Sequence, residues 1–97
     1  METISDSITV IEKELIYTMH FPKQEVLIDA KQIKERIREA QKAVKLDDSS
    51  QEEIKIVFED TEGLKMVKSA LWGVTDRFLM LKRGMTVPLH RIHEIII

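Results

Sequence analysis

The stretch that decides the fold is WGVTDRFLMLKRGMTVPLHRIHEIII, residues 72–97. Short runs of apolar and β-forming residues alternate there with polar turns, a pattern typical of antiparallel strands. The expected turns are Asp76-Arg77 and Arg83-Gly84. The expected strands are Phe78–Lys82, Met85–Leu89 and His93–Ile97.

The alternation of apolar and polar residues breaks between Leu89 and Ile92. Pro88 has no backbone N–H, so the strand that contains it is an edge strand or ends there. A short helical turn over Leu89–Arg91 accounts for the break.

Three further features precede this stretch. Ile54–Glu59 alternates as a strand with one apolar face, and Asp60–Gly63 is a turn in which Gly63 can take a positive φ. Leu64–Thr75 is long enough for one bent strand, with the bend or bulge at Gly73. Five short strands with tight turns favour a small antiparallel sheet or a partly open barrel.

This half resembles an Sm-like small β-barrel in its strand order and in the run VTDRFLML, residues 74–81. The resemblance covers Ile54–Ile97 and implies a small barrel. The chain contains no Asn, so the uridine-binding role of that family is not implied. The element Pro88–Ile92 is similar to the closing motif of the RNA cyclic group end recognition domain.

One amphipathic helix is expected over residues 30–46, which contain no Gly or Pro. Asp29 is a suitable N-cap because its carboxylate can accept from the free amides of the first turn. Ile33, Ile37, Ala40 and Val44 form one narrow apolar stripe. We therefore expect the helix to cover a sheet from one side.

The segment Ser7–Ile28 is rich in β-forming residues. We expect a strand over Leu15–Phe21, a turn at Pro22-Lys23 and a short strand over Gln24–Ile28. A helix over Ile8–Ile16 is the alternative, since its apolar residues also fit a helical period. Either reading leaves open whether this segment pairs with the C-terminal sheet.

The predicted fold class is therefore α+β. The C-terminal half is a small antiparallel sheet or partly open five-stranded barrel, joined by one helix and an N-terminal β-rich segment. The 97 residues form one expected domain, in which residues 1–46 supply the strands and helix and residues 51–97 the barrel-like half. Asp47–Ser50 is the one linker-like stretch.

Composition narrows the class of protein. With 43% hydrophobic and 33% charged residues, the chain has the make-up of a folded domain. It has no cysteine, which excludes disulfides and thiolate metal sites. No secretion signal or apolar run long enough for a membrane span is visible, so we expect a cytoplasmic protein without a membrane partner.

The sequence contains no catalytic or cofactor motif, such as a phosphate-binding glycine loop or a nucleophile elbow. We therefore predict that the protein is not an enzyme and needs no cofactor. His90 and His93 could share a metal on a helical turn, but the chain offers no full ligand set, so no metal site is predicted.

Five basic residues are candidate contacts for an anion or a nucleic acid. Arg offers a bidentate fork to phosphate, and His a neutral or charged donor. The alternative is that these side chains lie in solvated turns and strand edges. We expect Trp72 to pack in the core or under the helix, and the methionines Met66, Met80 and Met85 to fill the core. The five candidates are Arg77, Lys82, Arg83, His90 and Arg91.

Two functions remain. The first is a non-enzymatic interaction module that self-associates or binds a protein partner, because Ile95-Ile96-Ile97 needs both faces buried. The second is an RNA- or DNA-binding regulatory protein that uses a basic patch on the C-terminal barrel. The net charge of −2 favours the first.

Overall fold

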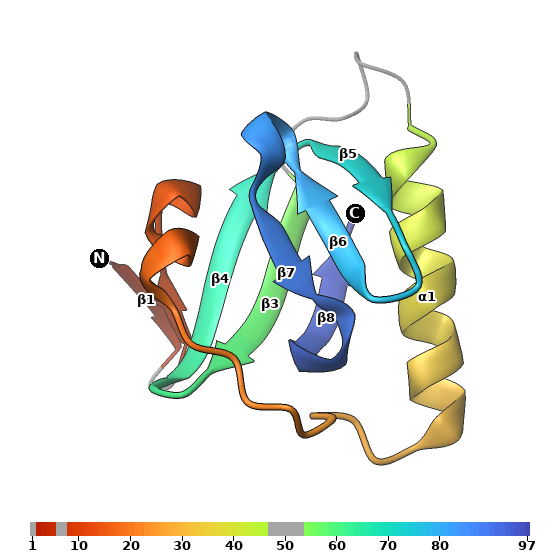
Figure 1. The fold of residues 1–97 in the computed structure, drawn as a ribbon, viewed down its shortest axis with the longest axis horizontal. Coiled ribbons are helices and arrows are strands. Elements are labelled where there is room, and N and C mark those ends of the chain that lie inside the picture. The colour runs from red at the N-terminus through yellow and green to blue at the C-terminus, as the bar shows by residue number, and fades with distance from the viewer. Residues whose placement is uncertain (1, 6–7, 47–53) are drawn as a thin grey trace.

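Two β-sheets and one long helix make up the structure (Figure 1). The computed structural model describes residues 2–5, 8–46 and 54–97. The strands are β1 (Glu2–Ser5), β2 (Ile8–Val10), β3 (Ile54–Asp60), β4 (Gly63–Ser69), β5 (Leu71–Val74), β6 (Phe78–Leu81), β7 (Thr86–Pro88) and β8 (Ile92–Ile96). The helices are α1 (Ala30–Val44) and the 3-10 helices η1 (Lys13–Thr18), η2 (Lys82–Gly84) and η3 (Leu89–Arg91). The predicted α+β class is confirmed.

The five-stranded sheet has the order β1-β2-β4-β3-β8, and the three-stranded sheet has the order β5-β6-β7. All pairs are antiparallel except β2 with β4, which shows that the N-terminal segment joins the C-terminal sheet. The chain passes from one sheet to the other at Ala70, between β4 and β5. The predicted strand Leu64–Thr75 is therefore two strands, with a bulge between Leu71 and Gly73.

Local turn chemistry was predictable. In the β3–β4 turn, Asp60 pairs with Gly63, whose φ is 130°. Asp60 Oδ1 accepts from the backbone N–H of Glu62 at 2.9 Å and from Lys65 Nζ at 3.1 Å. The expected helical turn over residues 89–91 is confirmed as η3.

The prediction for residues 15–28 was wrong. Lys13–Thr18 forms η1, whose Ile16 is buried while Leu15 and Tyr17 are exposed. The nearby outer edge of β4 is already paired with β2, so this segment has no strand to join. Residues 24–28 also form no strand. We call residues 19–29 the connecting segment; it runs along the base of the molecule to the start of α1 (Figure 1).

Helix α1 begins at the predicted cap, where Asp29 Oδ1 accepts from the backbone N–H of Lys31 at 2.9 Å. It ends at Val44, two residues earlier than expected, and the predicted linker Asp47–Ser50 lies outside the described residues. Ala40 and Ala43 are fully buried against the side formed by β5 and β8. None of the described helices is long and apolar enough to cross a membrane.

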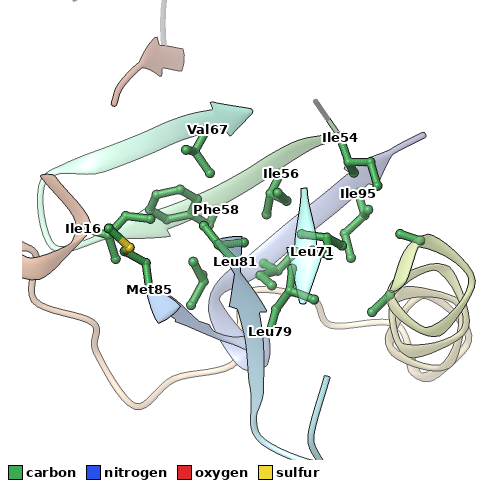
Figure 2. Close-up of a cluster of buried hydrophobic side chains, with 14 of the residues drawn as sticks. Ile16, Ile54, Ile56, Phe58, Val67, Leu71, Leu79, Leu81, Met85 and Ile95 are labelled. Carbon is green, nitrogen blue, oxygen red and sulfur yellow. The ribbon is translucent and has the colours of Figure 1, made fainter. Parts of the chain in front are cut away.

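The core lies between the inner faces of the two sheets and is closed by α1 and η1 (Figure 2). Phe58 and Ile56 of β3 meet Leu79 and Leu81 of β6 there, all with no exposed surface. The Phe58 ring lies 5.9 Å from the ring of Phe21 in the connecting segment. Both halves of the chain thus contribute to one hydrophobic core.

The two turn and bulge glycines allow a controlled test of backbone strain. Gly63→Ala should lower the free energy of unfolding by about 1–2 kcal/mol, because L-residues disfavour positive φ. Gly73→Ala is the matched control. A Cβ added at either glycine would meet no atom within 4 Å, and of these two glycines only Gly63 has a positive φ. Urea denaturation of both variants measures the difference, and equal losses would contradict this explanation.

Candidate interaction surfaces

The structure does not bring the five predicted basic residues together. Arg77 lies in the turn between β5 and β6, whereas Lys82 and Arg83 lie in η2, after β6. The two ends of β6 separate Arg77 from Lys82 by about 16 Å along the strand. His90 and Arg91 lie in η3, next to the connecting segment.

Arg91 belongs to the interior, with only 5% of its surface exposed. Its Nε donates to the backbone carbonyl of Glu59 at 2.9 Å, and its NH1 donates to that of Gln24 at 2.8 Å. Its NH2 lies 3.6 Å from Glu59 Oε2. Arg91 thereby ties the connecting segment to β3, and its guanidinium does not contribute to an outward-facing basic patch.

His90 makes a second tie to the connecting segment. Its Nε2 lies 2.9 Å from the carbonyl oxygen of Pro22, which can only accept, so we place the ring proton on Nε2. The backbone carbonyl of His90 accepts from the N–H of Val26 at 2.9 Å. Because the connecting segment has no strand partner, its backbone groups need donors and acceptors of this kind.

Arg36 is a buried residue that the sequence pattern did not single out. It is 6% exposed and binds Glu25 through both terminal nitrogens, at 2.6 and 2.7 Å. NH1 also donates to the carbonyl of Ile92 at 3.0 Å, while Nε has no partner among the described residues. The sequence feature that could have revealed its burial is its position in the apolar stripe of α1, three residues after Ile33 and four before Ala40.

The Arg36 pair has an electrostatic consequence. The hydrogen bond from Arg36 holds the pKa of Glu25 below its ordinary value, against the opposing effect of partial burial. The carboxylate form is therefore the one that the folded protein stabilises. This pair links the connecting segment, α1 and β8 at one point.

The remaining histidine of this region is also paired inside the fold. His93 Nε2 lies 2.9 Å from Glu59 Oε1. Within the part of the chain that the structure describes, no three His, Asp or Glu side chains are grouped so that they could hold a metal.

The outer face of the three-stranded sheet carries an exposed apolar row. Trp72, Phe78 and Met80 are 57%, 42% and 36% exposed, and we call them the exposed strip. Met80 pairs with Gly73 on one side, and Phe78 pairs with Pro88 on the other. The strip therefore runs from β5 across the central strand β6.

The predictions that Trp72 packs in the core or under the helix and that Met80 fills the core were wrong, whereas Met66 and Met85 are buried as expected. The bulge between Leu71 and Gly73 explains why Trp72 is exposed. It turns Leu71 toward the core and Trp72 to the opposite face.

Cations stand at both ends of the exposed strip. Arg77, Lys82 and Arg83 are all exposed, and none of the ion pairs within the described ranges includes them. Next to Phe78 is a hollow of about 500 Å³ between α1, the β5–β6 turn and η3. Its lining includes Arg77 and His90.

The second exposed feature is the C-terminal strand. β8 pairs with β3 and forms an outer edge of the five-stranded sheet. Ile95 is buried, but Ile96 and Ile97 are 40% and 53% exposed. A groove of about 450 Å³ separates the first part of β8 from α1, and Glu35 and Glu39 line its helical wall.

The Arg36–Glu25 pair can be tested by a double-mutant cycle. Glu25→Ala should lower the free energy of unfolding by about 2 kcal/mol, because it leaves a buried guanidinium without its partner. The variant with both Glu25→Ala and Arg36→Met should lose less than the sum of the two single losses. Urea denaturation measures all four proteins, and additive losses would argue against coupling.

The same pair predicts an acid dependence of stability. Because the folded state lowers the pKa of Glu25, its contribution is present above about pH 4.3, the ordinary Glu pKa, and is lost as the pH falls through the lowered pKa. The stability gap between wild type and Glu25→Gln should therefore shrink in acid. Urea midpoints at neutral and acidic pH measure this gap, and a constant gap would refute the assignment.

Comparisons with protein-family models, with curated proteins and with solved structures found no match to this chain. The resemblances to Sm-like barrels and to the RNA cyclic group end recognition domain therefore stay predictions. What the molecule does has to be inferred from its own surfaces.

Proposed function

We propose that the protein is a small, cytoplasmic, non-enzymatic interaction module that assembles with further copies of itself through the outer edge of β8. The observation that carries this proposal is the exposure of Ile96, and of Ile97 directly after it, at the end of a strand that is paired on one side only. Among the described strands, no partner covers that outer edge.

An open strand edge presents a row of backbone N–H and C=O groups to which another strand can bind. Monomeric proteins usually protect such edges with charged residues, prolines or bulges. Residues 95–97 are all isoleucine, so the end of β8 carries neither a charged residue nor a proline. A second copy that adds a strand there would bury isoleucine side chains and satisfy the backbone groups together.

The second half of β8 is the better place for such pairing. The carbonyl of Ile92, where β8 begins, already accepts from Arg36 of α1. The carboxylates Glu35 and Glu39 of α1 line the groove beside residues 93–95. Ile96 and Ile97 do not line this groove, so a strand added there would contact apolar side chains.

The small size of the protein supports association. A chain of 97 residues buries only roughly 60–65% of its unfolded surface, and oligomerisation is a common way to add to a small core. The internal use of Arg36, His90 and Arg91 also supports a non-enzymatic reading. These polar groups are engaged in hydrogen bonds that tie the fold together.

Light scattering coupled to size exclusion tests the proposal. Wild type should elute as a dimer or larger species, and Ile96→Lys should shift it toward the 11.3 kDa monomer, because a charge at the edge opposes strand addition. Ile28→Lys is the matched control, since Ile28 is a fully exposed isoleucine of the connecting segment and not of β8.

Two results would contradict self-association at β8. Wild type could remain an 11.3 kDa monomer up to high micromolar concentrations. Alternatively, Ile28→Lys could dissociate the assembly as strongly as Ile96→Lys, which would place the contact elsewhere or make it a general effect of charge.

A further inference from the structure

We propose that the outer face of the three-stranded sheet binds single-stranded nucleic acid, with bases on the exposed strip and phosphates on Arg77, Lys82 and Arg83. This surface is separate from the edge of β8, and the inference does not depend on self-association.

The exposed strip has the chemistry of a stacking platform. Trp72 and Phe78 present planar rings. Met80 lies between them, because it is two residues from Phe78 on β6 and pairs with Gly73, the neighbour of Trp72 on β5. The inward-facing neighbours Leu79 and Leu81 are fully buried, so the strip is held by a rigid sheet. Every base has an aromatic face, and aromatic side chains on a sheet can therefore stack successive bases without reading their sequence.

The charges around the exposed strip favour a polyanion. Lys82 and Arg83 stand at one end of β6 and Arg77 at the other, about 16 Å away, without ion-pair partners in the described ranges. Asp76 is the exposed acid nearest to them in sequence. Among the described residues these three exposed cations enter no ion pair, which favours an anionic ligand here although the whole chain has a net charge of −2.

A second copy of this protein fits the exposed strip less well. Two such faces packed about a twofold axis would bring like cations toward one another, which costs energy. A purely apolar partner would leave the three cations unused. Single-stranded nucleic acid supplies flat apolar surfaces and regularly spaced negative charge in the same molecule.

The hollow beside Phe78 gives one base a place to enter. At about 500 Å³ it falls within the range of small-ligand sites. Phe78, Ile33 and Ile37 supply apolar walls, and Arg77 lies next to Phe78 in the lining. Glu25 and Asp76 also line the hollow; the charge of Glu25 is paired with Arg36, and Asp76 adjoins Arg77 in the chain. A base can enter such a hollow only when it is unstacked, which favours single strands over duplex.

Trp72 makes the proposal directly measurable, because it is the only tryptophan. Oligo(dT) and oligo(rU) of about 15 nucleotides are titrated into the full chain while its fluorescence is followed. We expect saturable quenching, since stacking brings the base against the indole. Three phosphate contacts predict a slope of about −2 for log K against log salt concentration.

Variants test the two parts of the surface separately, with the anisotropy of a labelled oligo(dT) as the readout. Phe78→Ala should weaken binding roughly 5- to 100-fold, the range found for loss of one stacked base. Tyr17→Ala is its control, because Tyr17 is an exposed aromatic residue on η1. The charge-reversal variant is R77E/K82E/R83E, and its control on the exposed side of α1 is K31E/K34E/K42E.

Binding that is lost in R77E/K82E/R83E and Phe78→Ala but kept in both controls would support the proposal, provided that thermal unfolding is unchanged. Three results would overturn it: no quenching at about 50 mM salt, equal loss in the α1 control, or duplex DNA bound as tightly as single strands. A Trp72 emission that shifts with protein concentration alone would also overturn it, because a second copy would then cover the exposed strip.

Discussion

The connecting segment imposes the constraint on which the rest of the structure depends. Residues 19–29 cross the base of the molecule without a strand partner, yet they must position α1 against β5 and β8. Side chains perform the task that a sheet ladder would perform elsewhere: Arg91 and His90 bind its carbonyls, and Arg36 binds Glu25. Without these bonds, several backbone and charged groups would be buried unpaired, which folding does not tolerate.

This constraint also sorts the basic residues by function. The buried cations Arg36 and Arg91 are paired with carboxylates inside the fold, whereas Arg77, Lys82 and Arg83 are exposed. Net charge does not reveal such a division, because it adds buried pairs and exposed cations together. Net charge alone therefore does not describe the surface on which Arg77, Lys82 and Arg83 lie.

Features set by neighbouring residues could be predicted from the sequence. The cap at Asp29, the turn at Gly63 and the helical turn over residues 89–91 each follow from local backbone chemistry. Features set by distant partners could not. The carbonyls that Arg91 binds lie 32 and 67 positions earlier in the chain. Residues 13–18 form a 3-10 helix in a place where β2 already pairs with the edge of β4.

Trp72 shows how one bulge in a strand can decide which side chains a sheet exposes. The side-chain period of a strand is two, so the bulge at Leu71–Gly73 decides which residue faces the core. Leu71 fills the interior, and a tryptophan remains outside a core that is already closed by Leu79 and Leu81. A lone exposed apolar residue needs no explanation, but Trp72 shares its face with Phe78 and Met80. Keeping three large apolar side chains in water on one rigid sheet makes sense when a partner with flat apolar surfaces covers them.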